Sequence, residues 1–284
     1  MRPLPDYLPA LITPFTQRGE VDIKAHTHNM RALAGRGIEG FVIGGSNGEG
    51  PYLEPGERGQ LIKAGRRRKA HFMAGIAAES TRGALAQVSE VAEAGADTVL
   101  VLTPTTMARD RDAAIVDYYR AIAKASPIPV LIYSVPPVTA YSIPVELVAR
   151  LSRTDNIIGM KDSSGDVVRL QTIIDATPTG FILYSGSSRA LTAAMAVGCY
   201  GAITGSGNYA PELVLETLEK AKESPAEARK PQKRLSRLSA NVETHGVAGV
   251  KAAARAAGLL AGYPRHPMTR LSQGVEASIA KLIS

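Results

Sequence analysis

The chain has 284 residues, 45% hydrophobic and 21% charged, a composition typical of a globular protein rather than a disordered one. A single cysteine excludes an internal disulfide and fits a reducing compartment. The 33 basic and 26 acidic residues give a net charge of +7. This mild basicity would suit an anionic substrate or a nucleic acid. No aromatic and basic recognition motif accompanies the charge, so we expect no nucleic-acid partner.

No apolar stretch approaches the roughly 20 residues that a membrane span needs, and the N-terminal residues 1–6 contain no apolar targeting segment. We therefore expect a cytoplasmic protein without a membrane partner. The strongest basic cluster, residues 66–69, ends a predicted helix, where cations complement the helix dipole.

Short apolar runs alternate with amphipathic stretches, and the runs start about 20–30 residues apart, as strand-plus-helix units do. The predicted strands are Leu8–Ile12, Gly40–Ile43, His71–Ile76, Thr98–Leu102, Val130–Tyr133, Ile157–Met160, Phe181–Tyr184 and Gly201–Thr204. The helices predicted between them are Asp22–Arg36, Glu54–Ala70, Ser80–Ala94, Ile143–Ser152, Asp166–Ala176 and Ser188–Val197.

Eight consecutive units predict an α/β protein of the (β/α)₈ TIM-barrel class. The alternative is an open, doubly wound sheet, which usually carries a phosphate-binding glycine loop after its first strand. Here Thr13-Pro14-Phe15 follows instead, which favours the barrel.

The pattern changes near residue 225, beyond which only helices are predicted, at Ala226–Asn241, Val247–Gly258 and Leu271–Ile283. We therefore divide the chain into a barrel catalytic domain, residues 1–224, and a C-terminal helical extension, residues 225–284, packed on the barrel.

The active site of such a barrel lies at the carboxyl ends of its strands. The residues that follow the apolar runs are mainly hydroxyl-bearing residues and glycines, with one obvious cation, Lys161. An ammonium after an apolar run is poorly solvated, so we expect its pKa to fall and the free amine to be available for Schiff-base formation. A lysine there can also extend to solvent. Pairing with Asp162 is disfavoured, because adjacent strand residues point in opposite directions.

Two further features lie on neighbouring strands. Tyr133 ends the preceding strand, where a phenol beside an amine can relay protons, although a core tyrosine is an equal alternative. The loop Gly44–Gly50 carries four glycines and can direct successive backbone amides at a carboxylate, although it can also be a tight turn.

The sequence lacks the ligand spacing of a metal site. The histidines and Cys199 show no metal-ligand spacing, so we predict no metal site.

With these residues assembled, the sequence resembles the dihydrodipicolinate synthase and N-acetylneuraminate lyase superfamily of class I aldolases, over nearly the whole chain. The resemblance rests on Gly45–Glu49 with Glu57-Arg58 downstream, on Tyr133–Pro136, and on Gly159–Asp166. Within the superfamily, the Ser-Asn pair of the loop, residues 128–136 and residues 159–166 are most similar to 4-hydroxy-2-oxoglutarate aldolases.

The resemblance implies cleavage of a small 4-hydroxy-2-oxo acid to pyruvate and an aldehyde. Lys161 would form the Schiff base, Tyr133 would carry the proton of the C4 hydroxyl, and Ser46 would orient Tyr133. The backbone amides of Ser46 and Asn47 would hold the C1 carboxylate. The rest of the pocket would be lined by Ser163, Gly186, Ser187 and Ile203. The protonated imine would be the electron sink, so no metal or organic cofactor is implied, and the expected assembly is a homotetramer.

The sequence departs from the family pattern at two places. Val138 stands where dihydrodipicolinate synthases usually have an arginine, and Val138–Ala140 replaces the Asn-Thr-Gly of the oxoglutarate aldolases. After the fourth strand, Thr103–Met107 contains no tyrosine, where the family tends to place an aromatic residue that completes the proton relay across a subunit interface.

These departures leave alternatives open. One is a dihydrodipicolinate synthase, and another is an aldolase or dehydratase of 2-keto-3-deoxy sugar acids. A non-enzyme alternative is a paralogue that binds 2-oxo acids without turnover.

Overall fold

Eight parallel strands form one sheet in the computed structural model, which describes residues 4–66 and 70–283. The strands are β1 Tyr7–Pro9, β2 Gly40–Ile43, β3 His71–Ile76, β4 Thr98–Leu102, β5 Val130–Ser134, β6 Ile157–Asp162, β7 Ile182–Ser185 and β8 Gly201–Thr204. Their order is β1-β8-β7-β6-β5-β4-β3-β2, and a parallel bridge between Ala10 and Val42 closes the remaining seam. The predicted (β/α)₈ barrel is confirmed.

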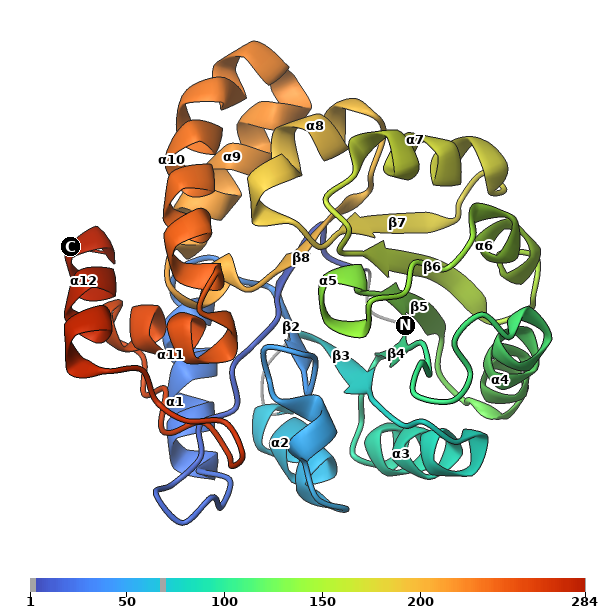
Figure 1. Ribbon diagram of the computed structural model, residues 1–284, viewed down its shortest axis with the longest axis horizontal. Coiled ribbons are helices and arrows are strands. Elements are labelled where there is room, and N and C mark those ends of the chain that lie inside the picture. Colours follow the sequence, from blue (N-terminus) through green and yellow to red (C-terminus); the bar gives the residue numbers. More distant parts are fainter. Residues whose placement is uncertain (1–3, 67–69, 284) are drawn as a thin grey trace.

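Helices surround the strands on the outside (Figure 1). Those of the barrel are α1 Ile23–Ala34, α2 Glu57–Gly65, α3 Thr81–Glu93, α4 Asp112–Ala125, α5 Pro136–Thr139, α6 Val145–Leu151, α7 Val167–Ala176, α8 Leu191–Ala196 and α9 Pro211–Glu223. Short 3₁₀ turns cover η1 Gly50–Tyr52, η2 Ser188–Ala190 and η3 Ser206–Asn208. Side chains at the N-caps Asp22, Ser80 and Asp166 accept a backbone hydrogen bond and so fix where α1, α3 and α7 begin.

Three barrel helices, α4, α5 and α9, were not predicted from the sequence. The signal was present in α4, because Ile115, Tyr119 and Ile122 recur at helical spacing and are fully buried. The first strand also lies earlier than predicted, since the chain after Pro9 keeps only the Ala10 bridge to the sheet. The predicted basic helix end extends into residues 67–69, outside the described range.

Three helices follow the barrel and lie on one side of it, drawn in orange and red in Figure 1: α10 Pro225–Glu243, α11 Gly246–Ala256 and α12 Gln273–Ile283. The C-terminal helical extension is therefore present. The division into domains of residues 1–224 and 225–284 stays a prediction.

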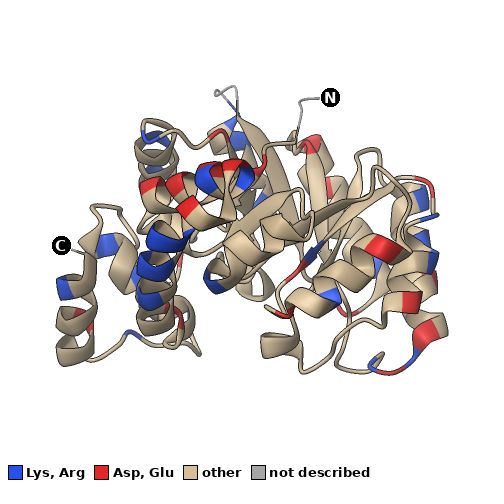
Figure 2. Cartoon of the chain, turned by 90° about the horizontal axis from the view of Figure 1, so that it is seen from above, with Lys and Arg blue, Asp and Glu red and all other residues tan. Residues whose placement is uncertain are grey.

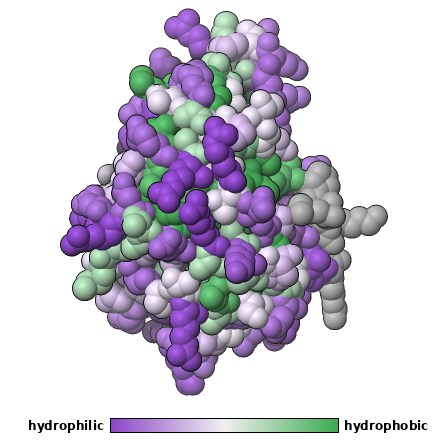
Figure 3. Space-filling view, turned by 90° about the vertical axis from the view of Figure 1, so that its right-hand side faces the viewer, coloured by the Kyte–Doolittle hydropathy of each residue, from purple (hydrophilic) through white to green (hydrophobic). Residues whose placement is uncertain are grey.

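Charge is distributed unevenly between strands and helices. The strands contain one Lys and one acidic residue, the neighbours Lys161 and Asp162, whereas the other charged residues lie on helices and loops (Figure 2). The face seen in Figure 3 is largely hydrophilic around smaller hydrophobic patches. Among the described strands, only β6 therefore contains Lys, Arg, Asp or Glu residues.

Candidate active site

Lys161 lies within β6 and points into the barrel mouth. The predicted strand ended at Met160, but β6 continues to Asp162 because Lys161 is in register with Tyr133 of β5 and Tyr184 of β7. The side chain is 5% exposed, and its Nζ atom lies 3.4 Å from the Tyr133 hydroxyl and 4.4 Å from the centre of the Tyr133 ring.

Asp162 points away from Lys161, as strand alternation predicts. Its carboxylate accepts a hydrogen bond from Arg169 Nε at 2.9 Å and another from the backbone amide of Ser164 at 2.8 Å. Lys161 makes no ion pair with an acidic group anywhere in residues 4–66 and 70–283. The amine is therefore buried beside a phenol rather than neutralised by a carboxylate.

Tyr133 connects Lys161 to the glycine loop. The hydroxyl of Ser46 lies 3.2 Å from the Tyr133 hydroxyl, which gives a continuous series Ser46–Tyr133–Lys161. Tyr119 does not extend it, because its hydroxyl contacts Thr103 Oγ1 and the Val101 carbonyl. Among the residues that the structure describes, this series of hydroxyl groups therefore ends at Ser46.

The loop after β2 is held in one shape by the lack of side chains. Gly44 has a φ of +71°, a conformation that favours glycine, and a Cβ on Gly50 would collide with the Gly44 carbonyl oxygen. Thr13 Oγ1 donates a hydrogen bond of 2.7 Å to the Gly48 carbonyl. This shape fixes Ser46 and Asn47 at the pocket.

Glu49 anchors the end of this loop through a buried ion pair. Its Oε1 lies 2.5 Å from Lys251 Nζ of α11, and neither side chain is exposed. Glu49 Oε2 accepts the backbone amide of Arg265, and Lys251 also donates to the Tyr263 carbonyl at 2.6 Å. Burial lowers the pKa of Lys251 to about 8, although Glu49 opposes that shift. The C-terminal helices thus hold the loop that carries Ser46.

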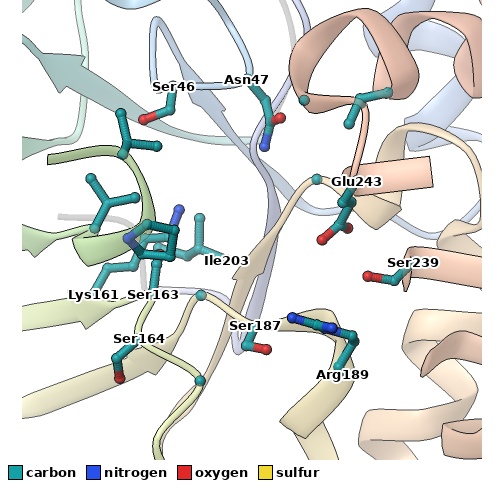
Figure 4. A pocket seen from close by; sticks show the side chains of 18 of the residues that line it. Ser46, Asn47, Lys161, Ser163, Ser164, Ser187, Arg189, Ile203, Ser239 and Glu243 are labelled. Carbon is teal, nitrogen blue, oxygen red and sulfur yellow. The ribbon is translucent and has the colours of Figure 1, made fainter. Parts of the chain in front are cut away.

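One cavity of about 690 Å³ joins these elements. Every site residue predicted from the sequence lines it: Ser46, Asn47, Tyr133, Lys161, Ser163, Gly186, Ser187 and Ile203. Figure 4 shows Ser46 and Asn47 across the cavity from Ser163. The structure therefore brings the whole predicted set together.

Some residues that line the cavity were not predicted from the sequence. Arg189 of η2 and the α10 residues Ser239 and Glu243 also line the cavity, and Figure 4 shows them facing Ser187. Glu243 Oε1 accepts hydrogen bonds of 3.0 Å from Ser188 Oγ and from the Tyr209 hydroxyl. Burial, reinforced by Glu243, raises the pKa of Tyr209. The only sequence signal was position, since Arg189 closely follows the end of a predicted strand.

No group of three or more His, Cys, Asp or Glu side chains able to hold a metal occurs in the described ranges. In the same ranges, no helix is both long and apolar enough to cross a bilayer.

An amine and a phenol facing each other at the mouth of a (β/α)₈ barrel are chemically suited to reactions of carbonyl compounds. The chain belongs to the Dihydrodipicolinate synthetase family, whose model matches residues 4–284. This membership confirms the expected superfamily and the expected type of enzyme, a carbon–carbon lyase.

Similar proteins are found in several organisms. The chain is 34% identical to an uncharacterized DapA-like lyase of Halobacterium salinarum, covering 97% of this chain and 93% of that protein. It is 32% identical to a 4-hydroxy-tetrahydrodipicolinate synthase of Archaeoglobus fulgidus, covering 94% and 92%. The structure of the chloride-inhibited dihydrodipicolinate synthase of Acinetobacter baumannii complexed with pyruvate is similar, with a TM-score of 0.91, 27% identity, and coverage of 98% and 97%.

Proposed function

We propose that this protein is a Schiff-base lyase that cleaves a small 4-hydroxy-2-oxo acid, of the 4-hydroxy-2-oxoglutarate type, to pyruvate and an aldehyde. The observation that carries the proposal is the buried Lys161 Nζ, 3.4 Å from the Tyr133 hydroxyl and without a carboxylate partner in the described chain.

The chemistry begins with attack of the neutral Lys161 amine on the C2 ketone, and loss of water gives a protonated imine. Tyr133 then takes the proton from the C4 hydroxyl, the C3–C4 bond breaks, and its electron pair moves into the imine to give an enamine. The aldehyde leaves and C3 gains a proton. Water then hydrolyses the imine, which releases pyruvate and restores the Lys161 amine.

The remaining pocket residues bind and orient the substrate. The backbone amides of Ser46 and Asn47 hold the C1 carboxylate, and Ser46 orients the Tyr133 hydroxyl, which lies 3.2 Å away. Ser163, Gly186, Ser187 and the Ile203 carbonyl line the space around the imine. Because the protonated imine accepts the electron pair, the reaction requires no separate electron sink.

Pyruvate as the product is supported by the Acinetobacter relative, which was solved with pyruvate. Lysine-pathway synthesis is the second candidate, favoured by the name of the Archaeoglobus relative. The position after Tyr133–Pro136 argues against it, because Val138 lines the cavity, is 69% exposed, and offers no positive charge for a second carboxylate. Sugar-acid cleavage or dehydration remains the third.

Borohydride reduction in the presence of pyruvate tests the proposal. We expect irreversible inactivation and a pyruvyl adduct on the peptide that contains Lys161. An unmodified Lys161 after reduction would contradict covalent catalysis. Parallel assays with 4-hydroxy-2-oxoglutarate, deoxy sugar acids, and pyruvate plus aspartate semialdehyde distinguish the three reactions. A protein that pyruvate stabilises against heat, but that consumes none of these substrates, would instead be a binding paralogue.

The expected assembly follows from the family resemblance, and the expected location follows from the amino-acid sequence. A homotetramer located in the cytoplasm stays a prediction, as does an incomplete relay after β4.

A further inference from the structure

Arg189 approaches the site from the strand beside Lys161. It lies in η2, directly after β7, and β7 pairs with β6 through Lys161 and Tyr184. Gly186 brings this connection close, because a Cβ on it would lie 2.9 Å from Lys161 Cε. Arg189 and Lys161 therefore face the same cavity from adjacent strands.

The backbone around Arg189 is held by α10. Gln232 Nε2 donates to the Ser188 carbonyl at 3.1 Å, and Ser236 Oγ donates to the Arg189 carbonyl at 3.3 Å. Gln232 Oε1 in turn accepts the amide of Thr192 at 2.9 Å. The main chain is thus fixed before any ligand arrives, which lowers the entropic cost of binding at this position.

The side chain of Arg189, unlike its backbone, is not held by an ion pair with another described residue. It is exposed, and no acidic group within residues 4–66 and 70–283 forms an ion pair with it. Glu243 lines the same cavity, but its carboxylate already accepts hydrogen bonds from Ser188 and Tyr209. Figure 4 shows the guanidinium extending toward the cavity beside Ser187. A cation that is not neutralised by the protein is available to an anion that enters the cavity.

We propose that Arg189 binds a carboxylate at the distal end of the substrate, so that the enzyme selects dicarboxylic 2-oxo acids. This inference rests on the proposed function, because it takes the substrate to be attached to Lys161 through C2. The planar guanidinium fork matches a carboxylate with two parallel hydrogen bonds. Ser163, Ser164 and Ser187 also line the cavity and carry hydroxyls without charge.

A matched pair of ligands tests the inference. 2-Oxoglutarate and 2-oxopentanoate have the same carbon chain and the same reactive ketone, and they differ only in a distal carboxylate against a methyl group. Calorimetry should show that the wild-type protein binds 2-oxoglutarate about tenfold more tightly, the lower end for a charge-assisted bond at an exposed site.

Single-residue variants test whether Arg189 causes the preference for 2-oxoglutarate. Arg189→Ala should reduce it to less than twofold by weakening 2-oxoglutarate alone, and Arg189→Lys should keep part of it. The matched control is Arg229→Ala, which removes one exposed arginine of α10 that does not line this cavity. Glu243→Gln should strengthen 2-oxoglutarate binding, because it removes a negative charge from the same cavity.

Two results would overturn the inference: no preference in the wild type, or a preference that persists in Arg189→Ala. Borohydride trapping of pyruvate, measured on each variant, separates this failure from that of the proposed function. Loss of preference with trapping intact supports the arginine site. Absent trapping in the wild type refutes the Schiff-base lyase, while calorimetry still reports whether Arg189 discriminates between the two acids.

Discussion

Lys161 and Lys251 are both buried lysines, and each places its Nζ within 5 Å of an aromatic ring, that of Tyr133 or of Phe15. Their polar partners differ. Lys251 lies 2.5 Å from the Glu49 carboxylate and also donates to a backbone carbonyl, whereas the partner of Lys161 among the described residues is the Tyr133 hydroxyl, at 3.4 Å.

The difference shows what burial alone does not determine. A carboxylate partner holds a lysine as a charged structural group, whose removal leaves a buried charge behind. A hydroxyl partner leaves the amine available for a ketone and provides a proton carrier beside it. The predictions below test this contrast between a reactive and a structural lysine.

The largest effect is expected at Lys161. Lys161→Ala should abolish cleavage, because no other described lysine lines the cavity, while the fold is retained. Steady-state cleavage and circular dichroism check both parts. Lys161→Arg is the matched control, since it keeps a cation without a nucleophilic amine and should be equally inactive. Turnover by either variant would exclude imine catalysis.

Tyr133 comes next. Tyr133→Phe removes the hydroxyl between Ser46 and Lys161, and it should slow turnover roughly 10²–10⁴-fold, the usual contribution of general acid–base catalysis. Single-turnover kinetics should show that imine formation with pyruvate persists. A rate close to wild type would mean that water or another group carries the proton.

Lys251 should behave in the opposite way. Lys251→Met leaves the Glu49 carboxylate buried without its cation, so the free energy of unfolding should fall by about 3–5 kcal/mol in denaturant titrations. The folded variant should still form an imine with pyruvate. A variant lacking both charges, Lys251→Met with Glu49→Gln, should be less destabilised than the single variant. A change below about 1 kcal/mol in the single variant would argue against a structural ion pair.

The smallest effect extends the contrast to a third buried base, His26 of α1. Burial lowers its pKa to about 4, so the unfolded chain takes up the proton first as the pH falls. Stability is therefore present above pH 6.5 and is lost as the pH falls toward 4, by about 2 kcal/mol between pH 7 and 5. His26→Gln should flatten that slope, whereas His28→Gln, on an exposed position of the same helix, should not. Equal slopes in both variants would refute the assignment.

The strands of the barrel and the positions of Lys161 and Tyr133 could be predicted from short stretches of the sequence. Apolar runs such as Thr98–Leu102 predict buried strands, and the carboxyl end of each strand must meet the others at one end of a barrel. Lys161 and Tyr133 could be found because they stand at the ends of two consecutive apolar runs. Strand alternation also predicted that the Asp162 side chain points away from Lys161.

The residues that were missed depend on contacts between distant segments. Arg189 and Glu243 meet at one cavity only because α10 packs on η2, and neither residue stands in a recognisable motif. The partner of Lys251 could not be read from an alanine-rich helix, since Glu49 lies about two hundred positions earlier and its pairing is decided by tertiary packing. Local periodicity does not encode such pairings.

The C-terminal helices supply Ser239, Glu243 and Val250 to the cavity, while the amine and the phenol come from neighbouring strands of the barrel. One wall of the cavity is thus encoded in a separate stretch of the chain from Lys161 and Tyr133. Mutation or recombination confined to residues 225–284 would therefore reshape that wall and leave the amine and the phenol in place, a route by which related enzymes can diversify.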